Sequence, residues 1–230
     1  MRFFAHRGAM ADGPENTLFA IEQAIMAGAE WIEIDIVAHQ GRLLVIHDLT
    51  LERTTNGEGF IAGYPLSYLR SLDAGLGQKI PYLEEVFKLT EGRIKLNIEL
   101  KSPGSAGLLA VLLQKTEISF PRSDLLVSSF DHRELLHFQQ CCPDIDLGLL
   151  LSGTPLDLKA TLGSLKVRSV HLSDEFVDPR FVAEIKAQGL AAYVYTVNSL
   201  SMLDRLQALG IDGVFTDYSE LWNQYRARIQ

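Results

Sequence analysis

The sequence predicts a closed parallel (β/α)8 barrel, the TIM-barrel fold, formed as one domain over residues 1–230. Short apolar strands alternate with amphipathic helical segments along most of the chain, which favours a parallel sheet. Polar residues interrupt the strands mainly at their C-terminal ends, where barrels of this kind carry their chemistry. The strands that are each followed by a helix begin near residues 2, 31, 95, 125, 146, 167, 191 and 213.

The first predicted strand is Arg2–His6, and it leads directly into Arg7 and a glycine. A helix follows, with Asn16 or Thr17 as its expected N-cap, because these side chains accept hydrogen bonds from free backbone N–H groups. Gly28 is expected to end this helix, since glycine readily adopts the left-handed conformation that closes one.

The second predicted strand, Trp31–Ile36, carries the most informative pattern in the chain. Isoleucines alternate with acidic residues at period two, so Glu33 and Asp35 share one face. Carboxylates two residues apart leave a strand ~7 Å from one another, and both can reach one hard cation. The alternative for this stretch alone is an edge strand whose two carboxylates lie in water.

An apolar run at 43–47 is surplus to the eight barrel strands. We expect it to return from the second strand as an antiparallel hairpin that turns near Gln40. The expected register pairs Glu33 with His47 and Asp35 with Val45, which would bring a histidine beside a carboxylate. Periodicity then fades, and we interpret residues 49–80 as an insertion without regular structure, more often functional than idle at this length.

From residue 95 the strand–helix alternation is regular to the end of the chain. Lys95–Lys101 repeats the pattern of the second strand, because Glu99 and Lys101 share one face. The next helix is expected to open with a capping box formed by Asp131 and Glu134. The later strands are expected at 125–129, 146–151, 167–172, 191–197 and 213–216.

Composition and charge narrow the function. The chain is 47% hydrophobic with a formal net charge of −8, which disfavours nucleic acid or an anionic membrane as partner. No apolar run approaches the ~18 residues of a membrane helix, and only Met1 precedes the first strand, which leaves no room for a signal peptide. Adjacent Cys141 and Cys142 cannot frame a disulfide scaffold. We therefore expect a cytoplasmic protein that does not insert into membranes.

Polar side chains at several strand ends are expected to converge on one site. Glu33, Asp35 and Glu99 form an all-oxygen set that suits Mg²⁺ or Ca²⁺ better than Zn²⁺. Arg7 matches the paired oxygens of a phosphate, and Lys101 acts as a point charge. With one divalent cation these side chains leave one net positive charge, which a phosphodiester would neutralise.

His6 and His47 are the expected general acid and base beside this charged cluster. Taken alone, His6 is more typical of a structural histidine than of a catalytic one. Together with the cluster they indicate phosphodiester cleavage, which requires a clamp for charge, a base for the nucleophile and an acid for the leaving oxygen. Two roles stay open: Glu15 lies either behind the metal site or in a helix's first turn, and His171 lies either in the core or in the pocket wall.

Motifs along the whole chain resemble those of the glycerophosphodiester phosphodiesterase family. In chain order they are His6-Arg7-Gly8, Pro14-Glu15-Asn16-Thr17, Glu33-Ile34-Asp35, His47-Asp48 with Arg53-Thr54-Thr55, Asn97-Ile98-Glu99-Leu100-Lys101, Ser128-Ser129-Phe130, Tyr195-Thr196-Val197-Asn198 and Gly213-Val214-Phe215-Thr216-Asp217. The resemblance implies a metal-dependent barrel that hydrolyses glycerophosphodiesters to sn-glycerol 3-phosphate and an alcohol.

The resemblance also implies a role for each matching residue. By that pattern the metal ligands are Glu33, Asp35 and Glu99, the acid/base pair is His6 and His47, and the phosphate contacts are Arg7 and Lys101. The family usually has tryptophan where this chain has Tyr195, which keeps the wall of the substrate pocket aromatic but adds a hydroxyl. Residues 49–80 lie where the family carries its insertion.

Three other functions explain the sequence less completely. A lysophospholipid or phosphoinositide substrate would need an apolar surface with a basic amphipathic stretch, which the insertion lacks. A barrel that only binds ligand would lack an expected histidine or carboxylate, and none is missing. A glycosidase would explain the carboxylates but not Arg7 and Lys101. The sequence is compatible with attack by water and with attack by the glycerol 2-hydroxyl through a cyclic phosphate. It is also compatible with either cation, any alcohol group and any oligomeric state.

Overall fold

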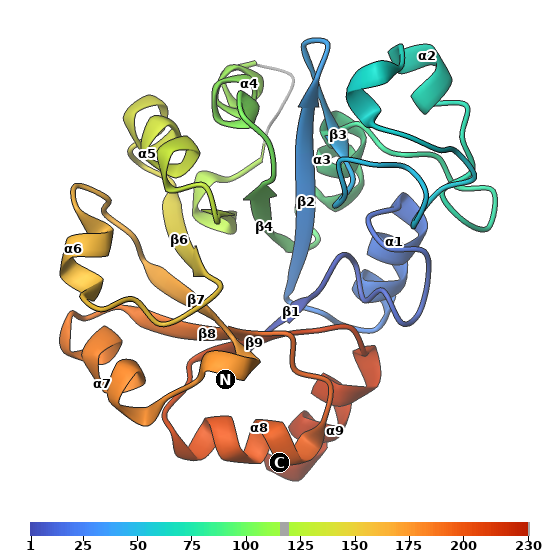
Figure 1. The fold of residues 1–230 in the computed structure, drawn as a ribbon. Helices are drawn as coiled ribbons and strands as arrows, with labels where there is room; N and C mark the ends of the chain where they lie inside the picture. Colours follow the sequence, from blue (N-terminus) through green and yellow to red (C-terminus); the bar gives the residue numbers. More distant parts are fainter. Residues whose placement is uncertain (116–119, 230) are drawn as a thin grey trace.

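The computed structural model describes residues 1–115 and 120–229, and its central feature is a barrel of parallel strands (Figure 1). The barrel strands are β1 (Arg2–Ala5), β2 (Trp31–His39), β4 (Lys95–Leu100), β5 (Leu125–Ser129), β6 (Asp146–Leu151), β7 (Ser169–Ser173), β8 (Ala191–Tyr195) and β9 (Gly213–Thr216). Each strand pairs in parallel with its neighbours, and β1 closes the ring by pairing with both β2 and β9. The predicted (β/α)8 barrel is confirmed, and only β7 begins clearly later than expected.

Helices surround the barrel on its outside (Figure 1). They are α1 (Leu18–Met26), α3 (Leu83–Thr90), α4 (Ser105–Leu113), α5 (His132–Cys141), α6 (Leu158–Leu162), α7 (Pro179–Ala187), α8 (Leu200–Ala208) and α9 (Ser219–Ile229). Among the residues described, no helix is both long and apolar enough to cross a bilayer. The cysteines at the end of α5 are unbonded, Cys141 exposed and Cys142 buried.

Strand alternation divides the core into two layers. The outward-facing isoleucines of β2 join the large cluster between the barrel and its helices. Inside the barrel a separate aromatic cluster fills the half nearest the strand N-termini, and it comprises Phe4, Trp31, Leu126, Tyr193 and Phe215. This apolar plug leaves the strand C-terminal half of the interior to polar side chains, because Glu33 and Asp35 follow Trp31 on the same face of β2.

β3 (Arg42–Val45) pairs antiparallel with β2, so the predicted hairpin exists, but the predicted register is wrong by one residue. Val45 faces Ile36 rather than Asp35. The cause is a two-residue loop: Gln40 and Gly41 both have positive φ, 46° and 74°, as tight hairpin loops require. His47 therefore lies beyond the paired strand, in the bend that follows it.

The segment 49–80 is more ordered than predicted. It contains a 3₁₀ turn, Ile61–Gly63, and the short helix α2 (Leu66–Leu69), which lies beside the β2–β3 hairpin in Figure 1. Its apolar side chains form a small cluster with one face of the hairpin, made of Val37, Leu44, Ile46, Leu51, Ile61, Leu69, Leu72, Ala74 and Ile80. This cluster stabilises a segment in which little regular hydrogen bonding occurs.

Two capping predictions have different outcomes. Thr17 caps α1, because its Oγ1 accepts the backbone N–H of Ala20 at 3.2 Å. Asp131 caps α5, but the expected capping box is wrong. Instead of returning to its own N-cap, the Glu134 carboxylate accepts the backbone N–H groups of residues 104 and 106, at 3.0 and 2.9 Å. Glu134 thus caps the neighbouring helix α4.

Candidate active site

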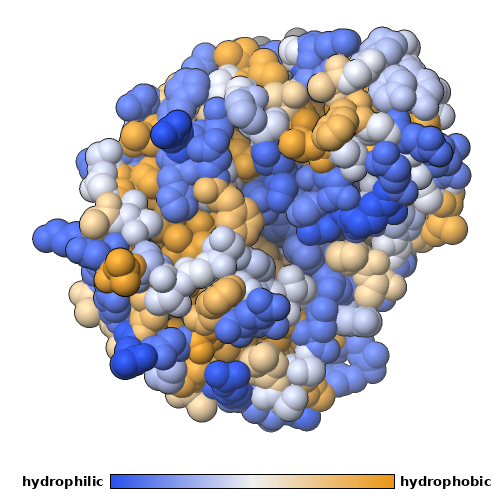
Figure 2. All heavy atoms as spheres, in the orientation of Figure 1, coloured by the Kyte–Doolittle hydropathy of each residue, from blue (hydrophilic) through white to orange (hydrophobic). Residues whose placement is uncertain are grey.

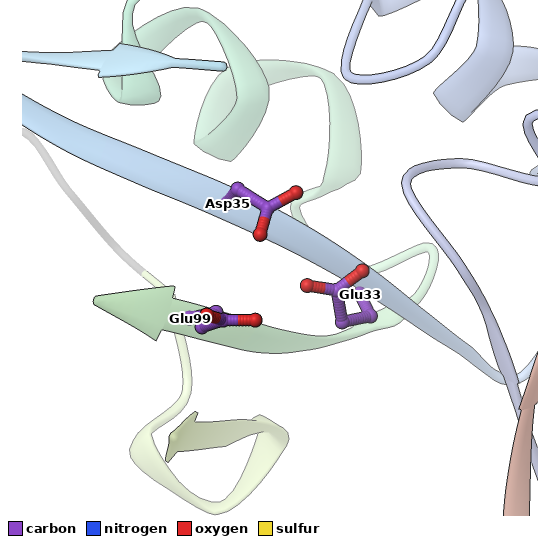
Figure 3. Close-up of side chains that lie close together, drawn as sticks. All are labelled: Glu33, Asp35 and Glu99. Atoms are coloured by element: carbon purple, nitrogen blue, oxygen red, sulfur yellow. The ribbon is translucent and has the colours of Figure 1, made fainter. Parts of the chain in front are cut away.

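Three carboxylates from the neighbouring strands β2 and β4 converge inside the barrel (Figure 3). Asp35 and Glu99 are partners in the β2–β4 register, and Glu33 lies two residues earlier on the same face as Asp35. One oxygen from each of the three carboxylates lies within 4.8 Å of the others. The three residues are nearly inaccessible, with exposures of 3% for Glu33, 1% for Asp35 and 9% for Glu99.

The charge of this triad is only partly compensated by the protein. Burial and the neighbouring carboxylates raise the pKa of Glu33, and the same causes raise the pKa of Glu99 to about 7. Burial also raises the pKa of Asp35, but nearby Arg7 and Lys101 outweigh it and hold that pKa below its ordinary value. A buried all-oxygen set with excess negative charge fits a hard divalent cation.

Arg7 and Lys101 border the triad. Lys101 Nζ lies 2.8 Å from Glu99 Oε1 and 3.7 Å from Asp35 Oδ1. Arg7 Nε lies 3.4 Å from Asp35 Oδ2, and the Arg7 backbone N–H donates to Glu33 Oε2 at 3.1 Å. Both basic groups therefore lie where they can contact an anion bound at the triad.

His6 follows β1, and its two ring nitrogens have different surroundings. Nδ1 lies 2.6 Å from Asp217 Oδ1, while Nε2 faces the triad at 3.9 Å from Glu33 Oε2. The other oxygen of Asp217 accepts from Asn198 Nδ2 at 2.6 Å. Asp217 thus fixes the orientation of the imidazole and leaves Nε2 directed into the site.

His47, like His6, has its Nδ1 beside a carboxylate, and it lies in the bend after β3. Its Nδ1 lies 2.5 Å from Asp48 Oδ1, and its Nε2 lies 3.1 Å from Lys101 Nζ. Burial lowers the pKa of His47. Although the hairpin register differs from the prediction, the bend after β3 still directs this imidazole toward the triad.

Ion pairs connect the two flanks behind the site. Arg53 Nε binds Asp48 Oδ2 at 2.6 Å, and its guanidinium also makes two bonds to Glu15, at 2.6 and 2.8 Å. Glu15 in turn accepts from Arg7 at 2.8 Å. The open question about Glu15 is therefore answered: it lies behind the site, bound to two arginines.

Sequence reasoning gave no role to several residues that the structure places here. Asn16 was considered only as a helix cap, yet it donates to Asp35 Oδ2 at 2.8 Å and accepts the Asp35 N–H at 3.1 Å. Asp48 and Asp217 lie in recognised motifs without an assigned partner. The available signal was their place beside a polar strand end, but adjacency does not identify which side chain each will bind.

The site opens into a cavity of about 180 Å³. It is lined among others by His6, Glu33, His47, Glu99 and Tyr195. The hydroxyl of Tyr195 donates to the backbone carbonyl of residue 151 at 2.7 Å, so its ring forms the wall. Figure 2 shows a hollow on this face of the molecule, with hydrophilic residues on one side of it and hydrophobic residues on the other.

Comparison with known proteins agrees with this geometry. The family model of the glycerophosphoryl diester phosphodiesterase family matches residues 6–221. A glycerophosphodiester phosphodiesterase of Caldanaerobacter subterraneus subsp. tengcongensis is 34% identical over 94% of this chain and 93% of its own.

Solved structures show the same similarity. An Oleispira antarctica phosphodiesterase, solved with the product sn-glycerol-3-phosphate, has a TM-score of 0.88 and 32% identity over 97% of this chain and 96% of its own. A glycerophosphodiester phosphodiesterase from Thermotoga maritima has a TM-score of 0.78 and 26% identity over 97% of each chain. The chain described here therefore belongs to the glycerophosphoryl diester phosphodiesterase family of enzymes.

Proposed function

We propose that this enzyme hydrolyses glycerophosphodiesters to sn-glycerol 3-phosphate and an alcohol, with one divalent cation and a two-histidine acid/base mechanism. The observation that carries the proposal is the convergence of three buried carboxylates, two basic groups and two oriented histidines at one end of the barrel. The bound product of the Oleispira antarctica relative supports the same substrate class.

Glu33, Asp35 and Glu99 would hold the cation, which is Mg²⁺ or Ca²⁺ in this proposal because every donor is a carboxylate oxygen. When bound, a divalent cation supplies Lewis acidity toward a phosphoryl oxygen. The raised pKa values of Glu33 and Glu99 support this assignment, since a bound cation would offset both the burial and the carboxylate repulsion that raise them.

Arg7 and Lys101 bind and orient the phosphodiester. The guanidinium suits two phosphate oxygens at once, and the ammonium adds a point charge beside Glu99. Glu15 holds the Arg7 side chain from behind, so Arg7 presents a fixed donor rather than a mobile one. Tyr195 forms the aromatic wall of the cavity and limits the directions in which the diester can lie.

His6 and His47 move the protons of the reaction. Each has its Nδ1 bound to a carboxylate, so each presents Nε2 to the substrate. One imidazole accepts the proton of the attacking oxygen, which belongs to water or to the glycerol 2-hydroxyl, as that oxygen bonds to phosphorus. The other imidazole donates a proton to the alcohol oxygen as its bond to phosphorus breaks. If the 2-hydroxyl attacks, water then opens the cyclic phosphate with the two imidazoles in reversed roles.

The test is an assay of sn-glycerol 3-phosphate release from a panel of glycerophosphodiesters that differ in the alcohol, with a lysophospholipid included. Chelator should abolish release, and added Mg²⁺ or Ca²⁺ should restore it. Full activity in excess chelator would refute the metal dependence. Failure to release sn-glycerol 3-phosphate from any member, with cation present, would refute the substrate class.

A further inference from the structure

Below the charged residues the cavity ends in three uncharged polar side chains, Asn97, Ser128 and His171, which we call the floor. Asn97 precedes Glu99 by two residues on the same face of β4, so it lies deeper in the barrel. His171 rests on the apolar plug, with its ring centroid 5.1 Å from that of Phe215. All three floor residues are buried, with exposures of 1%, 0% and 0%.

Two atoms of the floor have no hydrogen-bond partner among the residues that the structure describes. They are Asn97 Oδ1 and His171 Nδ1. The remaining polar atoms are used: Asn97 Nδ2 donates to Ser128 Oγ at 3.1 Å, and His171 Nε2 pairs with Ser169 Oγ at 2.9 Å. Because native proteins rarely leave buried polar atoms unpaired, these two atoms indicate that a ligand or water supplies their partner.

The position of His171 is defined by the strands around it. A Cβ at Gly148 would lie 2.4 Å from His171 Nε2, so only glycine at that position leaves room for the ring. Burial lowers the pKa of His171 to about 3, and the imidazole is therefore neutral at pH 7. The floor carries no charge of its own.

The uncharged floor suits one part of a phosphodiester better than the others. The phosphate is an anion, and its complementary groups, Arg7 and Lys101, lie at the mouth of the cavity. A neutral floor with an amide acceptor and an imidazole nitrogen suits a hydroxyl, which donates and accepts at once. The cavity, at about 180 Å³, is also smaller than the ~300–1,000 Å³ typical of drug-sized ligands, so it suits a small arm.

We propose that the floor binds a hydroxyl of the glycerol arm, so that the diester enters with glycerol toward the barrel interior and its alcohol toward solvent. This inference rests on the proposed function and adds the residues that would recognise glycerol. Any alcohol that stays outside the cavity would be tolerated, whereas loss of a glycerol hydroxyl would leave floor atoms unpaired.

The test is equilibrium binding, measured by calorimetry with a divalent cation present. The probes are sn-glycerol 3-phosphate, 3-hydroxypropyl phosphate, which lacks the 2-hydroxyl, and n-propyl phosphate, which lacks both. The parent should bind sn-glycerol 3-phosphate at least ~10-fold more tightly than n-propyl phosphate. His171→Phe keeps a ring of similar size and should reduce that ratio several-fold, as should Asn97→Leu. His39→Phe is the matched control, because His39 lies at the hairpin tip, bonded to the Tyr64 carbonyl.

Equal affinity of the parent for all three probes would overturn the inference. An unchanged ratio of the affinities for sn-glycerol 3-phosphate and n-propyl phosphate in the folded floor variants would also overturn it, since the floor would then hold only water. Ser128→Ala, the smallest change, provides the same comparison if a larger one prevents folding. Release of sn-glycerol 3-phosphate from diesters is measured separately. If the parent hydrolyses diesters but the floor variants keep the parental affinity ratio, only the role of the floor is refuted. If the parent prefers sn-glycerol 3-phosphate but does not hydrolyse diesters, only the proposed function is refuted.

Discussion

The mouth of the cavity, formed by the triad, Arg7, Lys101, His6 and His47, and its uncharged floor share the strand β4. The polar groups of the two regions nevertheless differ in how they are paired. At the mouth the two basic groups are paired with carboxylates: Lys101 Nζ lies 2.8 Å from Glu99 Oε1, and Arg7 Nη1 lies 2.8 Å from Glu15 Oε1. At the floor Asn97 and His171 are neutral, and each has an atom without a hydrogen-bond partner among the residues that the structure describes. Asn97 and Glu99 are only two positions apart on β4. The difference follows from depth: ions at the mouth can be compensated by side chains of the surrounding loops, and a group beside the apolar plug cannot.

Within the mouth, the two histidines show a second contrast. His6 is bound by Asp217, which is 211 residues distant in sequence, and His47 is bound by its own neighbour Asp48. Asp48 is itself tied to the insertion through Arg53. One imidazole is therefore fixed by closure of the barrel, and the other by a local loop.

The largest effect should come from removing a mouth histidine. We expect His6→Ala and His47→Ala each to lower kcat by ~10²-fold or more, because proton transfer is lost while the core is untouched. Steady-state kinetics together with the melting temperature check this. His39→Ala serves as the control, and near-parental kcat in both mouth variants would refute the acid/base assignment.

Weakening the triad should mainly change cation binding. Glu99→Gln removes one anionic ligand, so the affinity for Mg²⁺ or Ca²⁺ should fall by at least the ~10- to 100-fold that loss of an outer-shell partner costs. A metal titration of the protein measures this, with Glu58→Gln on the exposed insertion as control. Unchanged affinity in Glu99→Gln would exclude Glu99 from the metal site.

The carboxylates behind the histidines should have smaller effects than the histidines themselves. We expect Asp217→Asn and Asp48→Asn each to lower kcat by roughly 10-fold, because the imidazole loses its orientation. Asp48 raises the pKa of His47, so Asp48→Asn should also lower that pKa and move the corresponding limb of the pH–rate profile to lower pH. A profile identical to that of the parent would argue that Asp48 has only a structural role.

The smallest effect concerns stability at the floor. Because the pKa of His171 falls from 6.5 to about 3 on folding, the unfolded chain binds the proton more tightly. The neutral His171 therefore lowers the free energy of unfolding only below pH 6.5. Between pH 6.5 and pH 3 this free energy falls by at most ~1.4 kcal/mol per pH unit. Urea unfolding at pH 7 and pH 5 should show a weaker pH dependence for His171→Phe than for the parent. Equal dependence in the two proteins would contradict a buried neutral imidazole.

Local sequence determined a large part of this protein. Period-two alternation is a property of a few consecutive residues, so it predicted that Glu33 and Asp35 share a face of β2. It also predicted that Glu99, in β4, points to the same side as Lys101, which directly follows β4. The alternation of strands and helices is likewise visible in short stretches of sequence, and it predicted the barrel. The resemblance to a known family then supplied expected roles that no spacing rule contains.

Tertiary structure decided which groups meet. The hairpin register depended on whether one or two residues form the turn, Glu134 capped a neighbouring helix instead of its own, and His6 found Asp217 only because β1 and β9 are adjacent in the closed barrel. His171 was open between core and pocket wall, and it is both: fully buried and lining the cavity. A hydrogen bond requires two atoms within about 3 Å. The side of a strand to which a residue points depends only on its position in that strand. Two residues that are remote in sequence come within hydrogen-bond distance only after the ring of strands has closed.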